Sequence, residues 1–109
     1  MKLPFDSLIA RTKITHYLLV PQTRGDKSGF LKLAGYDSSQ ADQLIHDLRM
    51  QILVCEAVAS ESTAHGQFYE ISCPLVGPNG RTLDIRTIWM KEHLSGQTKF
   101  ITLIPERSR

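Results

Sequence analysis

Five polar residues of this chain have the side-chain types that metal-free phosphate chemistry requires. Cleavage of an RNA phosphodiester needs a base for the 2′-hydroxyl, an acid for the leaving oxygen and a cation for the phosphate. Glu70 or His65 would be the base and Arg86 would hold the phosphate. Lys27 or His16 would assist if the helices that carry them come close to the strands. These residues form one candidate catalytic group.

Other familiar chemistry is not indicated by the residue spacing. No pair of histidines has the spacing of metal ligands, so we expect no metal site. The segment 24–28 resembles half of a phosphate-binding loop, but its upstream glycine is missing and no strand precedes it. We find no nucleophile elbow and no dinucleotide fingerprint, and we expect no cofactor.

Two long strand patterns carry most of the candidate residues. Gln67–Val76 and Arg81–Met90 alternate apolar and polar side chains, as half-buried strands do. Between them, Pro78-Asn79-Gly80 fits a three-residue hairpin loop with Gly80 in the left-handed region. This turn predicts a register that joins apolar residues on one face: Leu75 with Leu83, Cys73 with Ile85, Ile71 with Thr87, and Tyr69 with Trp89.

The opposite face of this hairpin mixes charged and apolar side chains. Ser72 is expected opposite Arg86, with Glu70 and Asp84 as neighbours of that arginine. Phe68, Ile88 and Met90 offer apolar contact on the same face. Such a surface can bind a partner, and it can equally be a solvated face with a charge cluster, or a dimer contact.

The remaining elements follow from hydrophobic periodicity. Helical spacing predicts three short helices, over 12–19, 26–35 and from Ser38 or Ser39 to Ile52. Strand spacing adds Leu53–Ser60 before the hairpin and Thr98–Ile104 after it. We therefore predict an α+β fold, with three short N-terminal helices packed on one face of a four-stranded antiparallel meander. It would form a single domain over residues 1–109, with a helical half over about 12–52 and a sheet half over about 53–105.

Composition is that of an ordinary globular domain. The chain has 109 residues, 41% of them hydrophobic and 22% charged, and a net charge of only +2, which permits a nucleic-acid partner without suggesting one. No apolar run is long enough to span a membrane and no signal peptide is recognisable, so we expect a cytoplasmic protein. We interpret Cys55 and Cys73 as buried thiols in preference to a disulfide.

Several segments together resemble an uncharacterised family of small bacterial domains, a domain of unknown function numbered 6883. The resemblance covers most of the chain in order and is carried by Lys13–Leu19, Asp26–Ser28, Phe30–Leu31, Ala34–Tyr36, His65–Glu70, Leu75–Gly80, Thr87–Trp89 and Thr98–Leu103. It implies a bacterial protein, with cyanobacteria among the sources, encoded beside another small gene. Many members carry a His-Pro pair, which this chain lacks around Pro21.

Two hypotheses about function follow. The family context resembles toxin–antitoxin or toxin–immunity pairs, and the layout of helices and sheet resembles metal-independent ribonuclease toxins, so the first is a toxin-like protein acting on RNA. The second is a non-catalytic interaction module, or a homodimer, that binds a protein through Phe68, Ile88 and Met90 or through an exposed edge of the sheet. Its partner would be a small protein encoded by the neighbouring gene.

Overall fold

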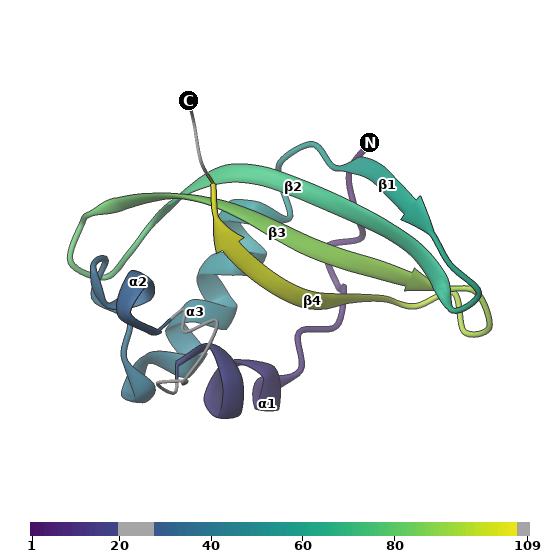
Figure 1. Cartoon of the computed structure of the whole chain (residues 1–109). Helices are drawn as coiled ribbons and strands as arrows, with labels where there is room; N and C mark the ends of the chain where they lie inside the picture. Colours follow the sequence, from purple (N-terminus) through teal and green to yellow (C-terminus); the bar gives the residue numbers. More distant parts are fainter. Residues whose placement is uncertain (20–27, 107–109) are drawn as a thin grey trace.

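The computed structural model describes residues 1–19 and 28–106. Helical elements come first and strands follow, so the fold is α+β with a four-stranded antiparallel sheet, as predicted (Figure 1). The helical elements, where η marks 3-10 or π-helical turns, are α1 (Arg11–Lys13), η1 (Ile14–Leu18), α2 (Ser28–Lys32), η2 (Ser38–Gln40), α3 (Ala41–Asp47) and η3 (Leu48–Ile52). The strands are β1 (Val58–Ser62), β2 (Gly66–Val76), β3 (Thr82–Glu92) and β4 (Thr98–Pro105).

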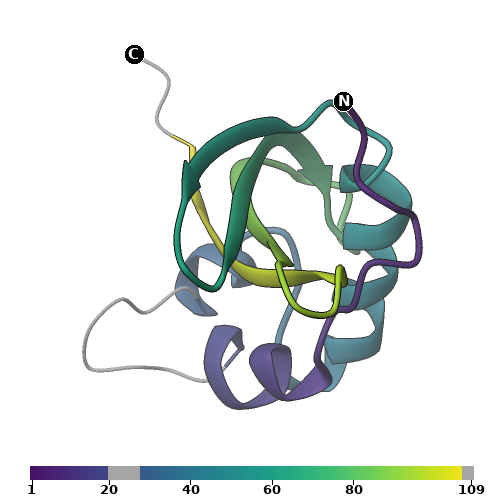
Figure 2. The same cartoon turned by 90° about the vertical axis from the view of Figure 1, so that its right-hand side faces the viewer.

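The sheet is a meander in which each strand pairs with the next one along the chain. Its order is β1-β2-β3-β4, and the helices lie on one side of it, while no helix of the described residues covers the other side, called the open side below (Figures 1 and 2). The predicted register of the central hairpin is confirmed: Leu75 pairs with Leu83, Cys73 with Ile85, Ile71 with Thr87, and Tyr69 with Trp89.

The turn between β2 and β3 has the predicted geometry and also docks onto α2. The amide of Gly80 donates to the carbonyl of Gly77 at 2.9 Å, and Gly80 has a φ of 85°, which favours glycine. The amide of Asn79 donates to the carbonyl of Ala34 at 3.2 Å, and its side chain donates to the carbonyl of Leu33. The turn therefore also satisfies the carbonyl groups of the two residues that directly follow α2, where the helical hydrogen bonds have ended.

The longest helical run, from Ser38 to Ile52, begins at a residue that the sequence analysis did not choose. Asp37, and not Ser38 or Ser39, is the N-cap, since its carboxylate accepts a hydrogen bond from the amide of Ser39 at 2.9 Å. The hydrogen bonds from Ser39 hold the pKa of Asp37 below its ordinary value. The predicted apolar stripe is buried, with Leu44, Leu48 and Ile52 fully inaccessible.

The first strand begins five residues later than the sequence predicts, at Val58 and not at Leu53. Leu53 still has helical backbone angles, and the amide of Cys55 donates to the carbonyl of Ile52, so the chain stays in a turn where a strand was expected. Strand β1 begins only at Val58, and all of its side chains are exposed. The apolar residues Leu53 and Val54 complete the last turn of the helix, which strand propensity alone does not reveal.

Trp89 is the centre of the core between the sheet and the helices. Its ring is fully buried, meets Phe100 edge-on with ring centres 5.2 Å apart, and donates from Nε1 to Thr87 Oγ1 at 2.7 Å. Thr87 in turn donates to the carbonyl of Ile71 at 3.2 Å. The buried polar atoms of this strand pair are thus satisfied within the sheet.

The interpretation of the two cysteines as buried thiols is wrong. Cys55 and Cys73 are joined in a disulfide, and both residues are only partly buried. The reason is the turn after η3, which brings Cys55 against β2 instead of placing it in a strand of its own. The bond ties the end of the helical run to the central hairpin.

Replacing Gly77 by alanine will destabilise the fold. A Cβ at Gly77 would lie 2.2 Å from the carbonyl oxygen of Ala34, so the turn must move away from α2, at a cost of about 2 kcal/mol. Gly29→Ala is the matched control, because nothing lies within 4 Å of its added methyl group and the helix should gain slightly. Chemical denaturation measures both, and equal stabilities would contradict the close contact.

Removing the disulfide will also lower stability. The bond closes a loop with a sequence separation of 18, and loss of a loop of this size costs about 3 kcal/mol through the entropy of the unfolded chain. We expect this loss in the Cys55→Ser/Cys73→Ser variant and in reduced wild type, measured by urea unfolding. Two titratable thiols in unreduced, unfolded protein would show that the bond does not form.

Candidate functional site

The open side of the sheet presents rows of side chains set by the strand register. In one row Ser72 of β2 pairs with Arg86 of β3, which pairs with Ile104 of β4. In the next row Glu70 pairs with Ile88. We call these five residues together with Phe68 the sheet face. Five of the six are partly buried and Ser72 is exposed, so their side chains are accessible from this side.

Arg86 is held between two carboxylates on the sheet face. Its Nε donates to Glu106 Oε1 at 3.0 Å, its Nη2 lies 2.9 Å from the same oxygen, and its Nη1 lies 3.7 Å from Glu70. Glu106 is positioned because its amide donates to the carbonyl of Asp84 at 2.9 Å, which extends the β3–β4 pairing past Pro105. The guanidinium therefore already has two anionic partners within the chain.

Glu106, the partner that lies nearest to Arg86, is not among the residues predicted from the sequence. Sequence patterns predict Glu70 and Asp84 as the neighbours of this arginine, and a last strand that ends before Pro105. The strand register could have indicated Glu106. Arg86 pairs with Ile104, and Glu106, two residues further along, has its amide directed towards β3 and its side chain on the same side of the sheet as Ile104. Two carboxylates against one guanidinium leave this part of the surface negative.

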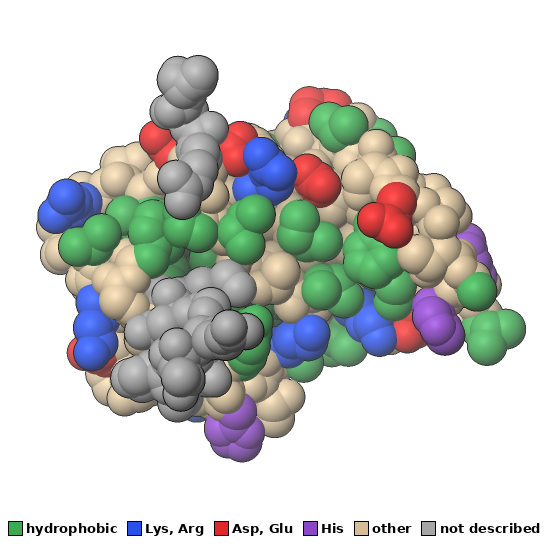
Figure 3. Space-filling view, in the orientation of Figure 1, with side chains coloured by type: hydrophobic (Ala, Val, Ile, Leu, Met, Phe, Trp, Pro, Cys, Tyr) green, Lys and Arg blue, Asp and Glu red, His purple; other side chains and the backbone are tan. Residues whose placement is uncertain are grey.

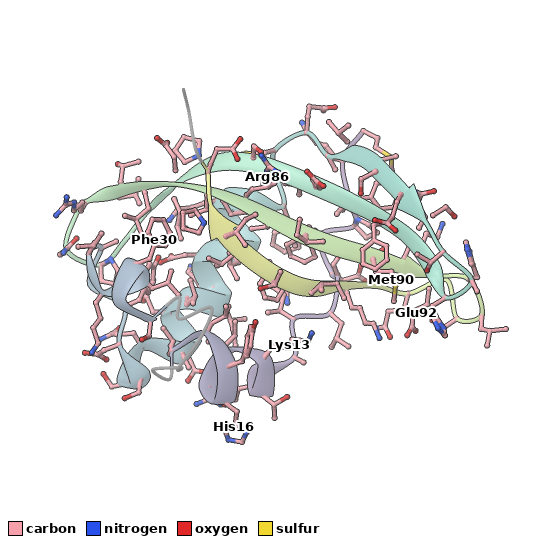
Figure 4. The ribbon with its side chains drawn as sticks, viewed as in Figure 1. Lys13, His16, Phe30, Arg86, Met90 and Glu92 are labelled. Carbon is pink, nitrogen blue, oxygen red and sulfur yellow. A yellow bond between two sulfur atoms is a disulfide. The ribbon has the colours of Figure 1, made fainter. Side chains whose placement is uncertain are left out.

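An apolar band lies next to this charged cluster. Phe68, Ile88 and Ile104 are partly exposed, and Figure 3 shows hydrophobic side chains crossing the face in view, with acidic and basic groups along one side of them and basic groups along the other. Met90, expected to share this surface, is only 8% exposed and so adds little to it (Figure 4). The accessible apolar part of the sheet face therefore rests mainly on Phe68, Ile88 and Ile104.

A groove borders the sheet face where the first helical elements approach β4. It has a volume of about 480 Å³ and is lined by Thr12, Lys13, Tyr17, Ile101 and Thr102. Lys13 Nζ donates to the backbone carbonyl of Ile101 at 3.2 Å, which fixes this side of the groove to the edge strand. Because Ile88 pairs with Thr102, the groove adjoins the sheet face.

His65 lies at the far end of the hairpin, in the turn between β1 and β2. Its carbonyl accepts from the amide of His93 at 3.0 Å, so this turn sits beside the β3–β4 turn. Gly66 follows His65 directly, and Ser72 is the residue of β2 that pairs with Arg86. The strand between Gly66 and Ser72 is about 20 Å long, at about 3.4 Å per residue. The structure brings Glu70 and Arg86 together but does not bring His65 to them.

The two remaining candidates do not join the sheet face. His16 is exposed on η1 and points away from the sheet (Figure 4). Lys27 lies outside the described residues. Within residues 1–19 and 28–106, no group of three or more His, Cys, Asp or Glu side chains is placed to hold a metal ion.

Near His65 the turn region holds a separate ion pair. Lys99 Nζ donates to Glu92 Oε2 at 2.7 Å and Ser95 donates to the other oxygen at 2.8 Å. These hydrogen bonds, with that of Lys99 the stronger cause, hold the pKa of Glu92 below its ordinary value. Both carboxylate oxygens of Glu92 therefore already accept hydrogen bonds, so Glu92 is not a free general base beside His65.

Fold and site together define a small α+β domain with one open, partly apolar sheet surface that carries an ion-pair cluster. The model of the family described as Domain of unknown function (DUF6883) matches residues 6–107, and the chain belongs to this family. A comparison with curated proteins found no match, and a comparison with solved structures found none either.

Replacing Arg86 by methionine will destabilise the domain modestly. The change leaves Glu70 and Glu106 facing each other without their shared cation, and we expect a loss of about 1 kcal/mol in the free energy of unfolding at low salt. The deficit should shrink in 1 M NaCl, because salt screens the repulsion between partly exposed charges. Arg81→Met, in the exposed turn, is the control, and a salt-independent deficit would contradict the electrostatic explanation.

Proposed function

We propose that this domain is a protein-interaction module that binds an apolar surface of another protein through the sheet face. The observation that carries the proposal is the apolar band of Phe68, Ile88 and Ile104, which no described helix covers (Figures 2 and 3). Exposed apolar surface of this kind, bordered by polar groups, is typical of protein contact sites.

The charges around the band indicate the chemistry of the partner. The cluster of Glu70, Glu106 and Arg86 has more negative than positive charge and lies along one side of the band. A partner that places an apolar centre on Ile88 and basic side chains over the two glutamates would complement this surface. The proposed partner is a small protein encoded by a neighbouring gene, and a second copy of this chain is the variant of the same idea.

The toxin-like alternative, an enzyme acting on RNA, receives less support from this geometry. Phosphate binding by Arg86 would compete with its two carboxylate partners, and no histidine among the described residues lies in its ion-pair cluster. A general base must reach the proton it removes, within about 3 Å or through one water molecule. RNA cleavage by His65, Glu70, Arg86 and Lys27 therefore stays a prediction from sequence alone.

The disulfide is relevant to the cellular location in which the protein would meet such a partner. Structural disulfides persist in oxidising environments and are rare in the cytosol of mesophiles. The bond between Cys55 and Cys73 is thus an argument against the cytoplasmic location that the sequence predicts. The cytoplasmic location itself stays a prediction. Among the described residues, no helix is long and apolar enough to cross a membrane.

A single charge on the sheet face tests the proposal. Ile88→Lys should abolish both self-association, measured by analytical ultracentrifugation, and binding to the co-expressed neighbouring gene product, because a buried unpaired lysine opposes the contact. Leu33→Lys is the matched control, since Leu33 is 47% exposed and lies in the turn that follows α2. It should bind as the wild type does.

Two results would contradict the proposal. One is a wild-type protein that stays monomeric and does not bind the neighbouring gene product. The other is binding that survives Ile88→Lys and so uses another surface. Degradation of total RNA by the wild type, lost in Arg86→Ala, would favour the RNA alternative instead.

A further inference from the structure

A second pocket lies on the other side of the sheet, where the helices no longer cover it. Tyr69, Lys91 and Thr98 come from three adjacent strands, and Lys91 follows the fully buried Trp89 by two residues on the core side. Lys91 is nevertheless exposed. A lysine at a core-side position therefore marks the place where the hydrophobic core ends and a polar hollow begins.

The N-terminal segment forms the opposite wall of this hollow. Backbone hydrogen bonds attach it at both ends: the amide of Leu8 donates to the carbonyl of Thr98 at 2.9 Å, and the amide of Ala57 donates to the carbonyl of Met1 at 2.7 Å. Leu3 is 5% exposed and anchors the segment in the core. Figure 2 shows this segment running down beside the helical run and the ends of the strands.

The pocket between the N-terminal segment and the strands has a volume of about 220 Å³. Its walls contain two lysines and a tyrosine but no acidic residue; the full lining is Met1, Lys2, Leu3, Pro4, Tyr69, Lys91, Gly96 and Thr98. This volume is below the range of about 300–1,000 Å³ typical of sites for drug-sized molecules. It is suited to one charged group of a ligand and not to a large molecule.

Three polar side chains of this pocket, those of Lys2, Tyr69 and Lys91, make no hydrogen bond or ion pair with a described residue. Within the part of the chain that the structure describes, no hydrogen bond or ion pair involves the ammonium groups of Lys2 and Lys91 or the hydroxyl of Tyr69. The amino group of Met1 pairs with Glu56 at 2.6 Å and is the main cause that holds the pKa of this carboxyl below its ordinary value, with a smaller contribution from Lys2. Two cations and a phenolic donor thus remain available.

We propose that this pocket binds the phosphate group of a phosphate monoester. Such a group carries a charge of about −1.5 to −2 at pH 7 and three acceptor oxygens, which matches two ammonium groups and one hydroxyl donor. Lysine binds phosphate as a point charge, and the phenol of Tyr69 adds a neutral donor. The part of Tyr69 that packs against the core holds the ring in place.

This inference does not rest on the proposed function. The pocket lies on the helix-bearing side of the sheet, whereas the apolar band lies on the open side. A variant of Lys91 therefore leaves the sheet face intact, and Ile88→Lys leaves the pocket intact. The two proposals fail or succeed separately.

Titration of the full chain with phenyl phosphate tests the site. We expect saturable binding by calorimetry, with amide NMR shifts confined to residues near Lys2, Tyr69, Lys91 and Gly96. Lys91→Met should weaken binding about tenfold, since a charged donor is lost. Tyr69→Phe should weaken it by a smaller factor while the unfolding midpoint stays the same, because the ring is kept.

Lys32→Met is the control, because Lys32 is an exposed lysine at the end of α2 and does not line the pocket. It should bind phenyl phosphate as tightly as the wild type. The proposal is overturned if no saturable binding occurs, or if Lys32→Met and Lys91→Met weaken binding equally, which would show general attraction to a basic surface. Circular dichroism confirms that each variant is folded.

Discussion

The rest of the structure depends on the contact between the β2–β3 turn and the end of α2. The turn fixes which residues of the two long strands face each other, and Asn79 then bonds to the carbonyls of Leu33 and Ala34. Gly77 allows the two backbones to meet, since no side chain would fit there. One short segment thus sets both the register of the sheet and its attachment to the helical layer.

A buried polar link reinforces the same end of the molecule. Tyr36 donates to Asp47 at 2.5 Å, and Gln43 donates to the other oxygen of Asp47 at 2.9 Å. Burial, with the hydrogen bond to Asp47, raises the pKa of Tyr36, so the phenol stays a donor and the carboxylate stays paired. Gln51 extends the link to β2 by bonding both the amide and the carbonyl of Val76. The helical run and the hairpin are therefore joined by groups that would be costly to separate.

Local rules were sufficient to predict the hairpin but not the contacts between distant segments. Alternation and turn chemistry gave the pairing of Arg86 with Ser72, because both depend on residues close in the chain. The bond between Cys55 and Cys73, the pairing of Arg86 with Glu106 and the burial of Met90 depend on how separate elements pack. His65 was grouped with Arg86 by chemical type, and the length of β2 keeps the two apart. A list of suitable side chains says little about a site until the distances along the strands are included.

The mismatch in length between strands and helices explains why one end of the core side is open. Eleven residues of β2 or β3 extend about 37 Å, whereas the helical run of 38–52 extends about 22 Å. The helices lie under one end of the sheet (Figure 1), so the strands continue beyond them. The N-terminal segment covers part of this excess, and Leu3 and Ile9 are buried in doing so. Where the N-terminal segment leaves the sheet uncovered, Lys91 can stand on the core side without the free-energy cost of burying a charge. The pocket lined by Lys2 and Lys91 lies at this place.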